Sequence, residues 1–265
     1  MTAREMQMEF ERRITLMNPD FEIKEKITSD TIFSFLNAYT ERFVRNNYLQ
    51  EDTVADGSRA QKKNVDALKG LVVRDLFKIE EKDENNTDRT TDRILIPSDY
   101  FLYIRSNSLL SKNYKLETPI DAMVGEGESA TEDLSKYVVA PNKLIREDDT
   151  DKVISSYYNK AIILTPYVVF NTSVFTDTIK DEEGKEETKS VERLCMNVIH
   201  DDYTIVKYVD LVYYRKPKRF DVIGVNDETV LDHCELPENV HMEIVEGAVE
   251  MFITEAKYRL NMKQN

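Results

Sequence analysis

Apolar residues spaced three and four positions apart predict three helices in the first third of the chain. The second helix is expected over residues 29–49. The first ends at Asn18-Pro19 and carries an apolar stripe of Met6, Phe10, Ile14 and Met17. The third is expected over residues 58–77, with a face of Val65, Leu68, Val72 and Leu76. Amphipathic helices of this length are not stable alone, so we expect them to pack on one another or on a partner.

A further helix is predicted near the C-terminal end of the sequence. Pro237 suits its first position, because the missing N–H of proline costs nothing there. The apolar stripe that follows consists of Val240, Ile244, Ala248, Met251 and Phe252. We expect this stripe to pack against the N-terminal helices.

Between residues 93 and 220 the pattern changes to short runs of β-branched and aromatic residues, which predict strands. Residues 80–92 contain no apolar side chain and predict a solvated linker. A charged stretch at residues 177–190 lies between the strand-like runs 167–176 and 191–200. We therefore expect a long hairpin with an exposed end near 177–190.

Helices thus precede strands, and one long helix follows the strands. This segregation predicts an α+β fold rather than alternating βαβ units. We expect a helical region over residues 1–79, a mainly antiparallel β-rich domain over 93–220, and a C-terminal helix over 235–265. The C-terminal helix and the N-terminal helices would form one helical bundle.

The charge balance excludes several partners. The 265 residues include 36 Lys+Arg against 50 Asp+Glu, which gives a net charge of −14. Sequence-independent nucleic-acid binding and docking on anionic membranes both need a basic face. No apolar run approaches the roughly 20 residues that span a bilayer, and the charged residues 1–13 lack the apolar core of a signal peptide. We expect a soluble, acidic, intracellular protein that binds no membrane.

No motif marks an enzyme. The closest pair of glycines lies in Gly125-Glu126-Gly127-Glu128, where the carboxylates would repel a phosphate. His233 and His241 lie near Cys234 but lack the spacing of a metal site. Cys195 and Cys234 are expected to be reduced and buried. We therefore expect no catalytic residue, no cofactor and no metal.

One basic stretch stands out on this acidic chain. Residues 215–219 (RKPKR) place four cations in five positions, directly after Tyr213-Tyr214. This stretch is either a docking site for an acidic partner or for nucleic acid that passes nearby, or a solvated turn after a strand. Pro217 cannot donate a ladder hydrogen bond, so strand pairing should stop there or reach a sheet edge. The pattern leaves both interpretations open.

Three segments carry a family resemblance when they are taken in order. They are residues 94–100 (ILIPSDY), residues 211–217 (LVYYRKP) and residues 236–249 (LPENVHMEIVEGAV). A P-x-D-Y turn before the β region, a late Y-x-x-P strand end and a closing L-P-x-x-x-H-x-x-I-V-x-x-A-V helix resemble the neck proteins of tailed bacteriophages, particularly the crAss-like phages. Residues 116–133 match nothing in this pattern.

The resemblance implies a structural virion protein and no enzyme. Such head-to-tail connectors form a ring, usually of twelve copies, below the portal. They join capsid to tail and line the channel through which the genome passes. The implied partners are further copies of the chain, the portal protein, other neck or tail proteins, and passing genomic DNA without sequence-specific binding. The implied location is the virion neck, after assembly in the bacterial host cytoplasm. An acidic channel wall would repel DNA phosphates and let the genome slide.

Within this interpretation, the basic stretch and the C-terminal helix are expected to contact neighbouring subunits. The expected interface residues are Tyr213, Tyr214, Arg215, Lys216, Lys218, Arg219, Ile244 and Phe252. Two alternatives remain: a tail or baseplate adaptor of similar construction, or a soluble enzyme whose site shows no motif. Assembly with tail components but without the portal would favour the first alternative, and turnover that depends on His241 or Cys234 would favour the second.

Overall fold

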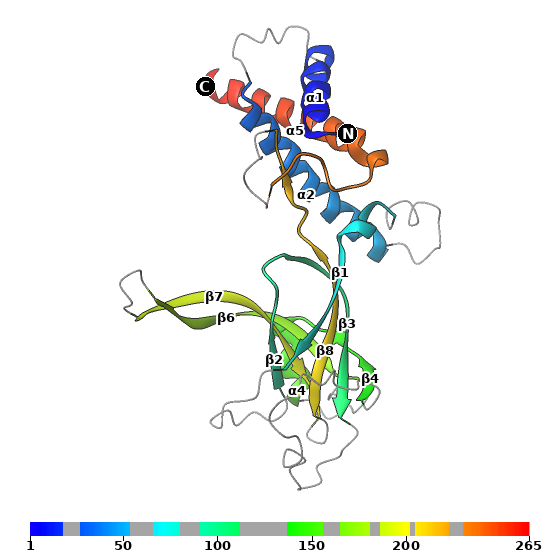
Figure 1. Ribbon diagram of the computed structural model, residues 1–265, viewed down its shortest axis with the longest axis vertical. Helices are drawn as coiled ribbons and strands as arrows, with labels where there is room; N and C mark the ends of the chain where they lie inside the picture. The colour runs from blue at the N-terminus through cyan, green and yellow to red at the C-terminus, as the bar shows by residue number, and fades with distance from the viewer. Residues whose placement is uncertain are drawn as a thin grey trace. The chain divides into compact units, whose positions relative to one another are not determined.

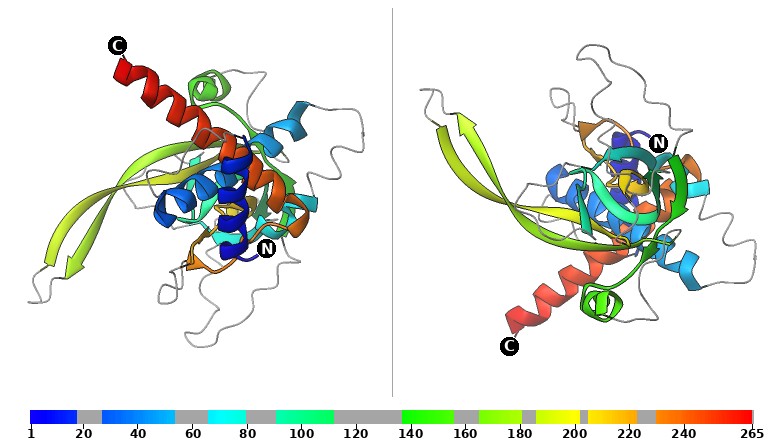
Figure 2. Two further views of the ribbon diagram at one scale, coloured as in Figure 1. Left: turned by 90° about the horizontal axis from the view of Figure 1, so that it is seen from above. Right: turned by 90° about the horizontal axis from the view of Figure 1, so that it is seen from below.

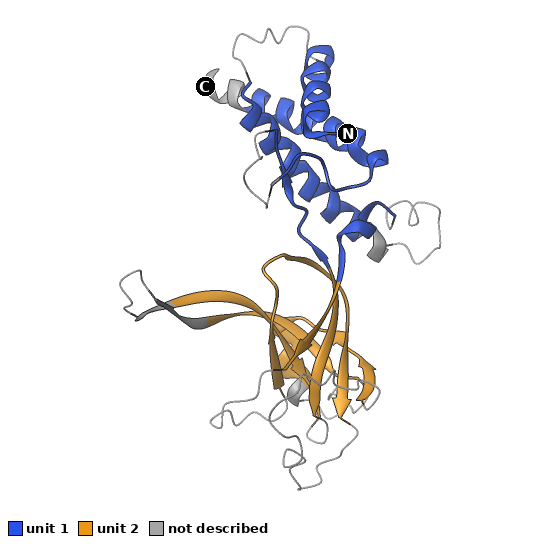
Figure 3. Ribbon diagram, viewed as in Figure 1, with its two compact units in different colours: residues 1–73, 214–265 blue, residues 74–213 orange. Residues whose placement is uncertain are grey.

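The computed structural model describes residues 1–17, 27–53, 66–79, 91–111, 137–155, 165–180, 186–201, 205–222 and 230–264. The chain divides into two compact units (Figure 3). Unit 1 combines residues 1–73 with residues 214–265, and unit 2 consists of residues 74–213. The chain leaves unit 1 within strand β1 (Val72–Lys78) and returns to it within strand β8 (Val206–Arg215).

Unit 1 is a helical bundle, as the sequence predicts. It consists of α1 (Ala3–Met17), α2 (Ser29–Thr53) and α5 (Glu238–Gln264), with α5 packed against both other helices (Figure 1). The ring of Phe252 on α5 lies 6.0 Å from that of Phe10 on α1 and 5.3 Å from that of Phe35 on α2, measured between centroids. Edge-to-face contacts of this kind favour one relative placement of the helices.

The first helix begins with a capping box. The Thr2 backbone N–H donates to the Glu5 carboxylate over 2.9 Å, and the Glu5 backbone N–H donates to the Thr2 hydroxyl over 3.3 Å. These two bonds satisfy N–H groups that have no acceptor within the helix. Unit 1 also contains a short 3₁₀ turn (Lys69–Leu71) and a two-stranded parallel pair of β9 (Arg219–Phe220) and β10 (Val230–Leu231).

The third predicted helix is wrong over part of its length. Residues 66–68 are helical, but residues from Val72 onward form strand β1. Val72 and Leu76 do share a face, because positions four apart share a face in a strand as well as in a helix. The spacing alone therefore fits both conformations, and hydrogen bonding to β8 makes this segment a strand. Residues 58–65 lie outside the described part of the chain.

Unit 2 is built from two four-stranded sheets. The first has the order β1-β8-β3-β4, with β3 at Tyr100–Ser111 and β4 at Tyr137–Pro141. The second has the order β2-β7-β6-β5, with β2 at Thr91–Leu95, β7 at Glu186–Ile199, β6 at Tyr167–Lys180 and β5 at Lys143–Leu144. Strand β7 pairs antiparallel with both β2 and β6, β3 pairs antiparallel with β4, and β5 pairs in parallel with β6. A 3₁₀ turn (Glu147–Asp149) and the short α4 (Thr150–Ser155) follow β5.

The two sheets of unit 2 meet through aromatic side chains. Tyr100 on β3 lies 5.5 Å from Phe170 on β6 and 5.5 Å from Tyr213 on β8 between ring centroids. Met196 and Leu211 are fully buried in the same unit. The contacts of Tyr100 identify which face of each sheet points inward.

Strands β6 and β7 form the long hairpin that the sequence predicts, with longer strands than expected. Fourteen residue pairs run from Tyr167 opposite Ile199 to Lys180 opposite Glu186. Strand β2 pairs with residues 195–199 and β5 pairs with residues 167–168. Beyond those neighbours the hairpin continues as a two-stranded ribbon that extends past the rest of unit 2 (Figure 2). We call residues 171–180 and 186–194 the ribbon.

The observed architecture confirms the predicted α+β class with a helical bundle and a mainly antiparallel β region. The loop at 116–133, the Gly125–Gly127 segment, the hairpin tip at 181–185 and most of the linker at 80–92 lie outside the described residues. Among the described helices, none combines the length and apolar character needed to cross a membrane.

Candidate functional site

The basic stretch at residues 215–219, which we call the basic turn, is held to unit 1 by acidic and amide side chains. Arg215 forms a bidentate pair with the Glu235 carboxylate, with one N–O distance of 2.9 Å, and both side chains are mostly buried. Lys216 lies 3.2 Å from the carboxylate of Glu41 on α2. The Lys218 backbone N–H also donates to Glu235, over 3.2 Å.

The pKa of Glu235 reflects this arrangement. Burial alone would raise it, but the hydrogen bonds from the Arg215 side chain and the Lys218 backbone outweigh burial and hold the pKa below its usual range. Directly after the turn, the Phe220 backbone exchanges two hydrogen bonds with Asn37 of α2, of 3.0 and 3.1 Å. Two of the four cations thus have partners inside unit 1, while Lys218 and Arg219 have exposed side chains.

Four other expected interface residues pack inside their own units. Tyr213 and Ile244 are fully buried, and Tyr214 is buried with its ring against Tyr48. Phe252 is half-buried between the rings described above. Burial leaves Tyr213, Tyr214 and Ile244 no surface for a partner to contact, so we correct their assignment: they stabilise the fold of the subunit.

The hydroxyl of Tyr213 lies between two carboxylates. Its oxygen is 3.1 Å from Asp75 on β1 and 3.1 Å from Asp99 in the turn before β3. Burial first, and then the two carboxylates, raise the pKa of Tyr213. The hydroxyl therefore stays protonated and donates to one carboxylate at a time. Sequence reasoning missed this contact, although Asp99 and Tyr213 both lie in the resemblance segments.

The histidines are held in structural contacts. Nε2 of His241 donates to the Leu236 carbonyl over 2.6 Å, and Nδ1 lies 3.0 Å from the Met1 amine. Burial lowers the pKa of His241, which favours the neutral ring. In unit 2, Nε2 of His200 lies 2.9 Å from the Asp92 carboxylate without the alignment of a hydrogen bond. Both side chains are buried, which keeps a substrate from reaching them.

The remaining candidates for chemistry are also buried or isolated. Cys195 and Cys234 are free thiols in the interior, and burial raises the pKa of Cys234 to about 11. A thiol with such a pKa is a poor nucleophile at neutral pH. Within the described ranges, no group of three His, Cys, Asp or Glu side chains is placed to hold a metal ion.

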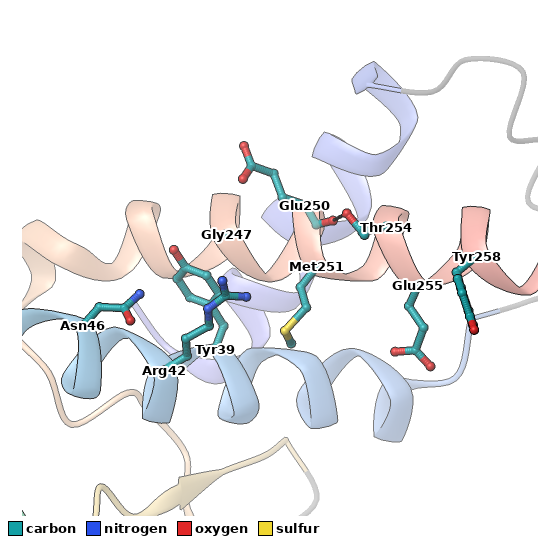
Figure 4. Close-up of a pocket in the computed structure, with 9 residues that line it drawn as sticks. All are labelled: Tyr39, Arg42, Asn46, Gly247, Glu250, Met251, Thr254, Glu255 and Tyr258. Carbon is teal, nitrogen blue, oxygen red and sulfur yellow. Dashed lines mark hydrogen bonds between the residues drawn. The ribbon is translucent and has the colours of Figure 1, made fainter.

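A groove of about 620 Å³ lies between α2 and α5 in unit 1 (Figure 4). Arg42 of α2 and Glu250 and Glu255 of α5 line it together with aromatic, amide and hydroxyl side chains. The helices cross closely here because of Gly247: a Cβ at that position would lie 1.8 Å from the Tyr39 ring. Glycine is costly inside a helix, so we attribute Gly247 to this close approach. The groove is lined by side chains of both charges, and the close approach at Gly247 explains where the helices cross. Its lining contains no nucleophile paired with a general base.

No protein-family model matches this chain, and no curated protein sequence matches it.

Proposed function

We propose that this chain is a structural virion protein, one subunit of a ring in the neck of a tailed phage that joins the portal to the tail and lines the DNA channel. The observation that carries the proposal is that residues of the three segments that carry the resemblance make contacts that hold the subunit together. Asp99 and Tyr100 of the first segment contact Tyr213 of the second. Arg215 of the second pairs with Glu235, which directly precedes the third. Motif residues that hold a subunit together are what a structural family requires.

The chemistry of the described residues supports the same proposal. The histidines lie in buried contacts or, for His233, beside an exposed Asp232 carboxylate, and the thiols are buried. The net charge of −14 suits a channel wall that repels DNA phosphates. A ribbon that runs past its own sheet gives each subunit a means to contact the next.

A reconstruction of virions that contain this chain tests the proposal. We expect a closed cyclic ring of copies adjacent to the portal, joined by heterologous contacts. A ring found among tail or baseplate components away from the portal would instead identify a tail adaptor. Absence of the chain from purified virions, single unsymmetrised copies, or hydrolysis of a nucleotide, peptide or glycan by the pure protein would overturn the proposal.

A further inference from the structure

The ribbon continues the inward face of its sheet into solvent. Phe170 points inward, where its ring meets those of Tyr100 and Tyr103, and Met196 opposite it is fully buried. Side chains two and four positions farther along the strands lie on that same face. They form what we call the ribbon face: Thr172 opposite Leu194, and Val174 opposite Glu192.

Exposure rises along this face as the first sheet stops covering it. The exposed fraction is 0% at Met196, 37% at Leu194 and 66% at Val174. Leu194 and Val174 are therefore exposed apolar side chains on the same side of the sheet that faces the core nearer the base of the hairpin. Because an isolated two-stranded hairpin is only marginally stable in water, a surface that covers this face would also stabilise the ribbon.

A matching surface lies on the outer side of strand β1. Asp75 contacts Tyr213 on the inward side of the first sheet, so the alternating residues Arg74, Leu76 and Lys78 lie on the outer side. We call these three residues the β1 face. All three are exposed, Leu76 by 45%, and Arg74 is held in place by two hydrogen bonds to Asp210 of 2.7 and 2.8 Å.

The β1 face complements the ribbon face in pattern and in charge. On the ribbon face, the exposed Val174 and Leu194 lie beside acidic Glu192. On the β1 face, the exposed Leu76 lies beside basic Lys78, while Arg74 is already paired with Asp210. On a chain with a net charge of −14, opposite charges that meet across a contact offset part of the repulsion between copies. The outer side of the first sheet also faces away from the second sheet, to which the ribbon belongs. A ribbon face can therefore meet a β1 face only on another copy.

We propose that the ribbon face of one subunit packs on the β1 face of the next subunit. Val174 and Leu194 cover Leu76, and Glu192 lies against Lys78. The two faces are different patches of one chain, so the contact is heterologous and can repeat around a closed ring. This inference rests on the proposed ring function and names the contact by which neighbouring copies meet.

Disulfide trapping between two tagged full-length variants tests the contact. Val174→Cys and Leu76→Cys chains are mixed in equal amounts and oxidised with glutathione disulfide. We expect at least about tenfold more cross-linked heterodimer than either homodimer, which corresponds to a preference of about 1.4 kcal/mol. The buried native thiols should not compete. The matched control replaces Leu76→Cys by Leu144→Cys, because Leu144 is equally exposed (47%) but lies on β5 of the other sheet.

Charge reversal supplies an independent arm. Glu192→Lys in the first chain or Lys78→Glu in the second should each lower the yield of heterodimer severalfold, and mixing both reversed chains should restore it. Circular dichroism checks that each variant keeps its fold. Cross-linking no stronger than with the Leu144→Cys control, or dominated by homodimers, overturns the inference. A virion ring whose neighbouring subunits meet through other surfaces would refute this contact and leave the proposed function standing. Trapped pairs from a chain that forms no ring in the virion would support the contact and refute the proposed function.

Discussion

The basic turn and the ribbon both draw attention in the sequence through their charges, yet they differ in what surrounds them. At the basic turn, Arg215 and Lys216 find Glu235 and Glu41 within the same unit. On the ribbon, Val174 and Leu194 lie on the face that is buried closer to the base of the hairpin, but at their positions this face is exposed to solvent. The difference shows that a cluster of like charge is a weak guide to a docking surface, since a folded chain can neutralise it internally. We propose the docking surface instead where strands extend beyond their sheet and expose apolar side chains.

The largest effect on stability should come from the part of unit 1 that the sequence alone suggested as an interface. Ile244→Ala should lower the free energy of unfolding by about 2–5 kcal/mol, because it leaves a cavity at a fully buried position. Denaturant unfolding followed by circular dichroism measures this change. Leu16→Ala on the exposed side of α1 is the control and should change stability by less than about 0.5 kcal/mol. Equal losses in both variants would contradict the assignment of Ile244 to the core.

The α2–α5 crossing should be the next most sensitive feature. Gly247→Ala should cost about 1–3 kcal/mol, because the added Cβ overlaps the Tyr39 ring, even though alanine favours a helix by up to about 1 kcal/mol. Combining it with Tyr39→Ala should make the two losses less than additive. Gly70→Ala is the matched control, since nothing lies within 4 Å of its would-be Cβ. Thermal unfolding of the four variants decides between a steric cause and a general sensitivity to lost glycine.

Arg215→Ala should lower the free energy of unfolding by about 1–2 kcal/mol, because Glu235 is then left mostly buried without its cation. Lys218→Ala should change stability by less than about 0.5 kcal/mol, since only its backbone N–H contacts Glu235. Denaturant unfolding of the two variants checks this. If both residues behaved alike, the basic turn would be a solvated loop in spite of its ion pair.

The same pair predicts a pH dependence. The pKa of Glu235 is lowered in the folded state, so the stabilisation it provides is fully present above its ordinary pKa of 4.5 and is lost as the pH falls through the lower folded value. The difference in melting temperature between the wild type and Arg215→Ala should therefore shrink below about pH 4.5. A difference that stays constant down to pH 3 would indicate that Arg215 acts through packing and not through its charge.

The smallest effect on subunit stability should come from the ribbon. Val174→Ser replaces a side chain that is 66% exposed, so the free energy of unfolding should change by less than about 0.5 kcal/mol. The same change should weaken association between copies, which sedimentation velocity of the wild type and the variant measures. A ribbon variant that destabilises the isolated subunit as much as Arg215→Ala would end the distinction drawn between the two regions.

The sequence predicted the helices with uninterrupted apolar stripes and the long hairpin, because both depend on local alternation. It failed at Val72 and Leu76, where a spacing of four fits a helix and a strand equally well. It also could not find the partners of Arg215 and Lys216, since a chain with 50 acidic residues offers too many candidates until the fold brings two of them close. The exposed ribbon face could not be predicted for a related reason. Local sequence predicts the length of a strand, but the point at which the opposing sheet ends depends on the tertiary fold.

The division of unit 1 into two separate stretches of sequence has a consequence for synthesis. Residues 1–73 cannot complete their core until residues 214–265 have left the ribosome, because α5 supplies the side chains between α1 and α2. Unit 2 is continuous in sequence and can fold while the rest is still being made. The apolar stripes of α1 and α2 therefore stay open throughout translation of unit 2, which makes the nascent helical segment the stage most exposed to misassembly and to chaperone binding.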